Sequence, residues 1–85
     1  MAKFVIESPH TDKECLQALD ETVKMGNIDK YVFGCKNGEH IAWAYVEADN
    51  AEDAINNNLP SFLRDNAFAH KVNKFSPEEI KAFHQ

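Results

Sequence analysis

The chain has 85 residues, enough for one domain spanning residues 1–85 around a small core. Its content of 44% hydrophobic and 27% charged residues is typical of a globular protein and excludes a disordered chain. The formal net charge of −5 argues against nucleic-acid binding, because phosphate contacts need a basic surface. No apolar run approaches the ~20 residues of a membrane span, and the start lacks a signal-peptide core. We therefore expect a cytoplasmic protein whose two cysteines are free thiols.

The chain opens with a predicted strand and helix. The strand covers Lys3–Glu7, and the proline of Ser8-Pro9-His10 closes it. Thr11 followed by Glu14 is a capping-box pattern, which predicts a helix beginning near Asp12. The apolar residues of this helix recur at spacings of three and four, so we expect one buried stripe made of Cys15, Leu16, Leu19 and Val23. Gly26 is expected to end the helix.

The segment Tyr31–Val46 predicts a β-hairpin. Asn37-Gly38 can supply the two positive-φ residues of a type I′ turn, and apolar residues flank it on both sides. A two-residue turn would place Cys35 opposite His40 and Phe33 opposite Ala42. Alternation along the strands then sorts the side chains into two faces, both apolar in the middle, so each face needs a cover.

The two faces differ in side-chain size, which predicts what covers each of them. Helices approach a sheet most closely over small side chains, so the face with Ala42, Ala44 and Val46 is expected beneath the helices, together with Phe4 and Ile6. The opposite face is expected to lie open for a second copy of the chain and carries Val5, Val32, Ile41, Trp43 and Tyr45. The alternative places Trp43 and Tyr45 beneath the helices, with the alanines facing outward.

The rest of the chain predicts three further elements. A second helix begins near Asn50 or Ala51, with Asp49 or Asn50 as its cap, and Pro60 breaks it. A fourth strand covers residues 67–75, with Phe68, His70 and Val72 on one side. Ser76-Pro77 then starts a short terminal helix, with the serine as its cap.

The order of these elements is β-α-β-β-α-β with a terminal helix. It predicts an α+β, ferredoxin-like domain, in which an antiparallel sheet carries two helices on one face. This order, together with the passage Val46–Ala54 and the following Leu59-Pro60, resembles the dimeric α/β-barrel superfamily. The resemblance implies a homodimer whose sheets pack face to face. That superfamily includes muconolactone-isomerase-like enzymes, cofactor-free monooxygenases and metal-binding proteins, so the fold does not select one activity.

Four side chains able to bind a transition metal come from segments that this topology brings to one edge of the sheet. They are His10, Cys15, Cys35 and His40. His10 precedes the first helix, Cys15 lies in its first turn, and the other two flank the hairpin turn. Nitrogen and thiolate ligands suit zinc, nickel or copper, so one interpretation of these four residues is a metal site.

The same residue types leave other interpretations open. Cys35 and His40 could act as a thiolate–imidazole pair, in nucleophilic or redox chemistry. Cys15 and Cys35 could form a disulfide under oxidising conditions. The cysteines could also be small buried hydrophobic residues, with His40 merely exposed.

Three function classes follow from this pattern. The first is a homodimeric binding domain for a metal or small molecule. The second is a cofactor-free isomerase or monooxygenase that uses a cavity between protomers; no catalytic residue is identified. A pocket there, or one between the sheet and the helices, could take its polar groups from Glu7, Tyr45 and His70. The third is a regulatory domain whose Trp43 and Tyr45 contact another protein.

Overall fold

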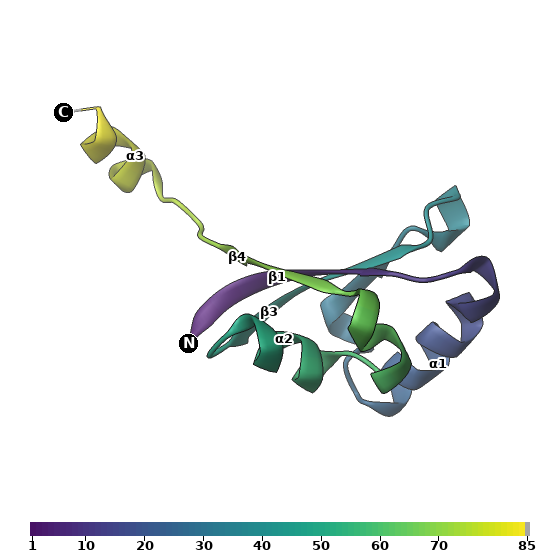
Figure 1. Ribbon diagram of the computed structural model, residues 1–85. Helices are drawn as coiled ribbons and strands as arrows, with labels where there is room; N and C mark the ends of the chain where they lie inside the picture. The colour runs from purple at the N-terminus through teal and green to yellow at the C-terminus, as the bar shows by residue number, and fades with distance from the viewer. Residues whose placement is uncertain (85) are drawn as a thin grey trace.

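A computed structural model describes residues 1–84 as an antiparallel four-stranded sheet with helices packed on one face (Figure 1). The strand order is β2-β3-β1-β4, so β1 and β3 are the two central strands. The strands are β1 (Ala2–Pro9), β2 (Tyr31–Phe33), β3 (Ile41–Ala48) and β4 (Phe68–Val72). The helices are α1 (Cys15–Lys24), α2 (Ala51–Asn58) and α3 (Pro77–Phe83). Both the element order and the strand order agree with the expected ferredoxin-like arrangement.

The helix-covered face of the sheet holds the core. Its buried side chains include Phe4, Ile6, Ala42, Ala44 and Val46, as the sequence predicts. Small alanines on β3 leave room for the helix layer that lies beneath the sheet in Figure 1. Tyr31 joins this core and donates a hydrogen bond from its hydroxyl to the Asn58 carbonyl oxygen, 2.6 Å away. This bond ties β2 to the end of α2.

Neither α1 nor α2 covers the opposite face of the sheet. Val32 is 66% exposed and Tyr45 is 40% exposed, while Val5, Ile41 and Trp43 are half-buried. Phe68, His70 and Val72 share this face, because they stand opposite Glu7, Val5 and Lys3 in the ladder. The assignment of the two faces is therefore confirmed, and the alternative with Trp43 beneath its own helices is wrong. We call this surface, made of Val5, Val32, Ile41, Trp43, Tyr45 and Phe68, the open face.

Side-chain caps define where each helix begins. The Thr11–Glu14 capping box is present and opens a short 3-10 helix, Asp12–Glu14, that leads into α1. Asn50 caps α2 by accepting a hydrogen bond from the Asp53 amide, 2.8 Å from its Oδ1 atom. Ser76 caps α3, with proline at the first helical position. After α2, Pro60 interrupts the helix and a 3-10 segment, Ser61–Asn66, leads to β4.

The prediction of which side of α1 is buried is wrong. Leu16 is 68% exposed and Val23 is 58% exposed, whereas Ala18 and Thr22 are buried. The Thr22 hydroxyl donates to the Ala18 carbonyl oxygen at 2.7 Å, so its burial leaves no unpaired polar group. Only Cys15 and Leu19 of the predicted stripe are partly buried.

The hairpin has the predicted register but a different turn. Tyr31, Val32 and Phe33 pair with Ala44, Trp43 and Ala42, as a two-residue turn would require. The connection is instead a 3-10 helix, Cys35–Asn37, and Gly38 is its residue with positive φ, at 87°. Because β2 ends before Cys35 and β3 begins after His40, these two residues are not ladder partners, which corrects the expected pairing.

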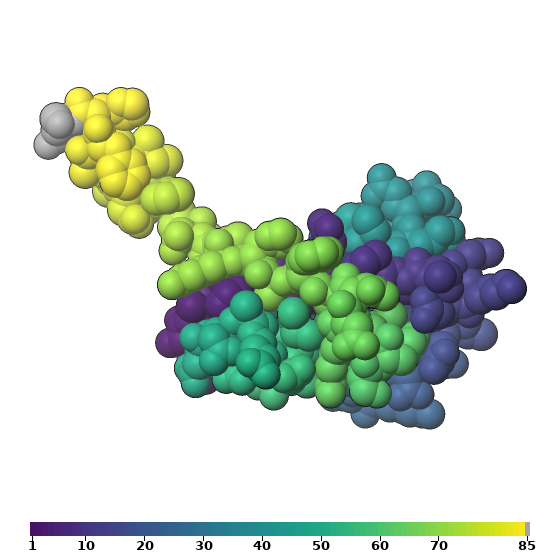
Figure 2. All heavy atoms as spheres, in the orientation of Figure 1, coloured from purple at the N-terminus to yellow at the C-terminus, as the bar shows by residue number. Residues whose placement is uncertain are grey.

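The fourth strand is shorter than predicted and ends at Val72, so residues 73–75 lead outward to α3. In Figures 1 and 2 this segment and α3 project from the end of β4, away from the body of the domain. Within residues 1–84, no helix combines the length and apolar character needed to cross a membrane.

Candidate metal centre

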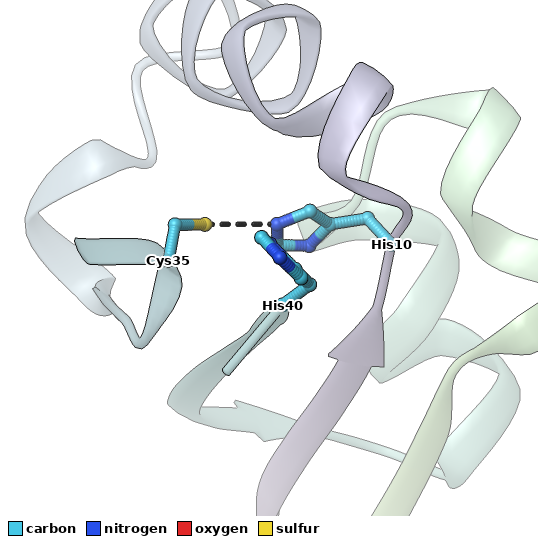
Figure 3. Close-up of side chains that lie close together, drawn as sticks. All are labelled: His10, Cys35 and His40. Carbon is cyan, nitrogen blue, oxygen red and sulfur yellow. Dashed lines mark hydrogen bonds between the residues drawn. The ribbon is translucent and has the colours of Figure 1, made fainter. Parts of the chain in front are cut away.

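The candidate site lies at the sheet edge where β1 ends and β3 begins. The His10 amide donates a hydrogen bond to the His40 carbonyl oxygen at 2.9 Å, which extends the β1–β3 pairing beyond the ladder. The 3-10 helix of the hairpin folds over this edge and brings Cys35 to the same place. One ligand atom from each of His10, Cys35 and His40 lies within 4.8 Å of the others (Figure 3).

Gly34 allows the hairpin to fold over the edge in this way. Its carbonyl oxygen accepts hydrogen bonds from the amides of both Asn37 and Glu39, at 2.9 and 3.0 Å. A Cβ atom at position 34 would lie 2.8 Å from the Glu39 carbonyl oxygen and 3.3 Å from the Trp43 ring. Only glycine fits this close approach without displacing the backbone, so Gly34 fixes the position of the following Cys35.

His10 and Cys35 make the closest contact of the site. Their Nε2 and Sγ atoms are 2.9 Å apart, and the dashed line in Figure 3 marks this hydrogen bond. Burial, followed by the hydrogen bond and charge interaction with the neighbouring Cys15 thiol, raises the pKa of the Cys35 thiol to about 11. At neutral pH the protonated thiol therefore dominates, and the tautomer of His10 decides whether the thiol or the imidazole donates this hydrogen bond.

Both histidines carry a nitrogen that lacks a partner. His10 is 8% exposed, and its Nδ1 atom is buried without a hydrogen-bond partner among residues 1–84. The same is true of Nδ1 of His40 within this part of the chain. Buried polar atoms are rarely left unpaired in folded proteins. Each ring therefore keeps one buried nitrogen without a partner, and on His10 this is the nitrogen that does not face Cys35.

A carboxylate lies at the outer side of the site. The Oδ1 atom of Asp12 is 3.8 Å from Nε2 of His40, and its side chain is 89% exposed. This contact is an ion pair only when His40 is protonated. Asp12 was not identified as a site residue from the sequence, although its position two residues after His10 places it at the same edge. Carboxylates beside metal-binding histidines orient the ring, so Asp12 could serve that purpose.

Cys15 is the one predicted ligand that the three-residue cluster does not include. It is the first residue of α1 and lies beside Cys35, whose thiol pKa it affects. Both cysteines are free thiols in the structure. The predicted set of four is therefore found as a cluster of three, with the fourth thiol adjacent.

The cavity between protomers stays a prediction, and one copy of the chain shows only a hollow on the open face. A hollow of about 230 Å³ on this face is lined by Val5, Lys30, Val32, Trp43, Ala44 and Tyr45. Of the three predicted polar residues, Tyr45 lines this hollow, whereas Glu7 and His70 do not. A larger hollow of about 470 Å³ adjoins the candidate cluster and includes His10, Glu14, Asp65 and Phe68 in its wall.

Comparisons with known proteins add no assignment. A scan of protein-family models and searches of curated proteins and of solved structures gave no significant match. The resemblance to the dimeric α/β-barrel superfamily thus rests on the sequence pattern and the strand order alone. Function has to be inferred from the geometry of the site.

Proposed function

We propose that this chain is a metal-binding domain that holds zinc, nickel or copper through His10, Cys35 and His40. The observation that carries the proposal is the convergence of three soft or imidazole donors from three separate segments, all within 4.8 Å. Two of these donors flank the hairpin turn and the third follows β1. Such a set is typical of zinc and of other transition metals of similar ligand preference.

The spacing of the donors supports this proposal. Around a tetrahedral metal with bonds of about 2.0–2.3 Å, donor atoms lie about 3.3–3.7 Å apart. The His10–Cys35 distance of 2.9 Å would widen slightly as a metal replaces the shared proton. The widest separation, up to 4.8 Å, would contract by roughly 1 Å, which side-chain rotation alone can supply. Cys15 is the proposed fourth donor, because its thiol lies beside that of Cys35.

The test is direct metal titration of chelator-treated protein. Zn²⁺, Ni²⁺ and Cu²⁺ would be titrated separately, with Co²⁺ as a spectroscopic probe whose thiolate charge-transfer band reports a sulfur ligand. We expect Cys35→Ser and His10→Gln to weaken zinc binding by about 100-fold or more, and Cys15→Ser by about tenfold. His84→Gln is the matched control, because His84 is exposed at the far end of α3 and should leave affinity unchanged. Failure of the unmodified protein to bind any of the three metals more tightly than about 1 mM would refute the proposal.

Metal affinity should also rise with pH. The metal binds the thiolate, whereas the pKa of Cys35 near 11 keeps the thiol protonated in the metal-free protein. Each thiol ligand therefore releases one proton, so zinc affinity should increase about tenfold per pH unit between about pH 7 and about pH 9 with Cys35 alone, and more steeply with Cys15 as the fourth donor. A competing chelator dye measures this slope, which Cys35→Ser should lower by about tenfold per pH unit. An affinity that is flat over this range would show that Cys35 is not a ligand.

The His10–Cys35 hydrogen bond favours a second candidate function, thiol chemistry assisted by an imidazole. The raised pKa of Cys35 opposes it, because an activated nucleophile needs a lowered one. Alkylation rates measured across pH separate the two functions. If Cys35 reacts in the metal-free protein with an apparent pKa below that of an ordinary thiol, thiol chemistry replaces metal binding as the better proposal.

We also propose that the chain forms a symmetric homodimer across the open face. Val32 and Tyr45 are exposed and Trp43 is half-buried, and burial of each large apolar side chain is worth about 1.5–3 kcal/mol. Sedimentation equilibrium should show a dimer at micromolar concentration. Val32→Glu and Trp43→Glu should shift it to monomer, while Gln17→Glu, an exposed change on α1, should not. A monomer at about 100 μM in the unmodified protein would overturn this proposal.

A further inference from the structure

We propose that the C-terminal arm, residues 73–84 with α3, docks its apolar stripe onto the open face of a second copy of this chain. This inference rests on the proposed homodimer. It goes further by naming the segment of one copy that covers the open face of the other. Two copies related by two-fold symmetry would exchange arms reciprocally, so each open face would receive one arm.

The arm carries large apolar side chains that its own domain leaves in solvent. Phe75 is 57% exposed, Ile80 is 47% exposed and Phe83 is 68% exposed. Phe75 and Phe83 contact each other edge to face, with ring centroids 5.7 Å apart. Ile80 and Phe83, three residues apart on α3, lie on one side of the helix and extend this cluster into a stripe. A helix of seven residues with such a stripe gains stability mainly by packing it against another surface.

The direction in which the arm leaves the domain indicates which surface it can contact. Beyond Val72 the chain continues past the end of β4, on the side away from the α1–α2 layer (Figure 1). Residues 73–76 contain no glycine, and Pro77 keeps Ser76 extended, with φ −86° and ψ 159°. Nothing in this linker provides a tight reversal toward the arm's own sheet. The arm therefore reaches outward, toward the space that a second copy occupies in the proposed dimer.

The open face offers a complementary surface. Its hollow of about 230 Å³, floored by Val5, Trp43 and Tyr45, has room for one large apolar side chain. Lys30 stands at the margin of this hollow, and the first turn of α3 carries Glu78 and Glu79. Opposite charges on the hollow's margin and on the arm favour one orientation of α3 on the partner.

The arm already begins at this surface in its own chain. The Lys74 Nζ atom lies over the Tyr45 ring, 5.1 Å from its centroid. The arm is thus continuous with the open face at its base, and its apolar end projects beyond the sheet, as Figure 2 shows. In the proposed dimer, a two-fold axis close to this base would place the projecting end over the partner.

A cross-linking experiment on the full chain tests the exchange. Phe83 is replaced by the photo-reactive p-benzoylphenylalanine in isotopically light protein, which is mixed with an excess of heavy protein lacking the probe. After irradiation, mass spectrometry should find light–heavy adducts on the segment that carries Trp43 and Tyr45. If the probe cross-links only to the sheet of its own light chain, and no light–heavy adduct forms, the arm folds onto its own sheet and the proposal is overturned.

The oligomeric state, measured on the same samples, separates this inference from the dimer itself. A dimer whose arm gives no sheet adduct overturns the exchange and leaves the dimer standing, whereas a monomer overturns both. In addition, Ile80→Glu and Phe83→Glu should raise the dimer dissociation constant about tenfold or more. Ala82→Glu adds the same charge on the other side of α3 and should change it less than about threefold.

Discussion

The two faces of the sheet differ in how their apolar side chains are arranged. On the covered face, the side chains of β3 are small: they are Ala42, Ala44, Val46 and Ala48. Helix α2 packs against them. On the open face of the same strand, Ile41, Trp43 and Tyr45 stand clear of both helices. Small side chains thus mark where a helix packs within the chain, and large ones mark a surface that the chain leaves free.

The difference also separates stability from association. Side chains of the covered face are buried in a single copy, so their contribution to folding does not depend on protein concentration. Side chains of the open face are only partly buried in one copy, so most of the free energy available from them would come from a partner. Substitutions on the two faces of one strand should therefore behave differently.

The largest expected effect is on β1, where Ile6 and Val5 point to opposite faces. Ile6 is completely buried, so Ile6→Ala should lower the free energy of unfolding by about 2–5 kcal/mol. Val5 is half-buried on the open face, and Val5→Ala should cost about 1 kcal/mol or less in the monomer. Urea unfolding at several protein concentrations measures both. Equal costs for the two substitutions would show that both faces are closed within one chain.

A smaller effect is expected at Gly34, where the hairpin tip passes close to Trp43. The added methyl group of Gly34→Ala would lie 2.8 Å from a backbone oxygen, so the tip must shift, at a cost of about 1–3 kcal/mol. The shift should move Cys35 and weaken zinc binding as well. Gly38→Asn is the control, since Gly38 has positive φ and open space around it, which asparagine tolerates. If both variants bind zinc like the unmodified protein, Gly34 does not position the site.

The sequence predicted the faces and the register of the hairpin because alternation leaves little freedom. A shift of one residue would place Tyr45 in the core and Ala44 in solvent. The turn was not predictable in the same way. Asn37-Gly38 fits a type I′ turn, yet Gly34 allows a 3-10 helix that uses only one residue with positive φ. Local turn signals do not show a close approach between distant backbone atoms, such as that of Gly34 to Glu39.

Three of the four candidate ligands converge at the predicted edge of the sheet, but partly for a different reason than the sequence suggested. Topology brings the end of β1 and the hairpin turn to one edge, which is why His10 joined Cys35 and His40. The sequence suggested that Cys35 and His40 meet as strand partners, whereas the 3-10 helix brings them together. The contribution of Asp12 depends on the side-chain direction of His40, which residue spacing does not indicate.

The smallest expected effect concerns α1, where a count of apolar residues misidentified the packed side. Thr22 is buried because its hydroxyl bonds to the Ala18 carbonyl oxygen, so a residue counted as polar occupies the interface. Leu16→Ala should therefore change the free energy of unfolding by less than about 0.5 kcal/mol, since the side chain is 68% exposed. Ala18→Leu should cost about 1–3 kcal/mol by overpacking the same helix. A cost above about 2 kcal/mol for Leu16→Ala would mean that α1 packs through the side predicted from the sequence, and that the covered face is built differently.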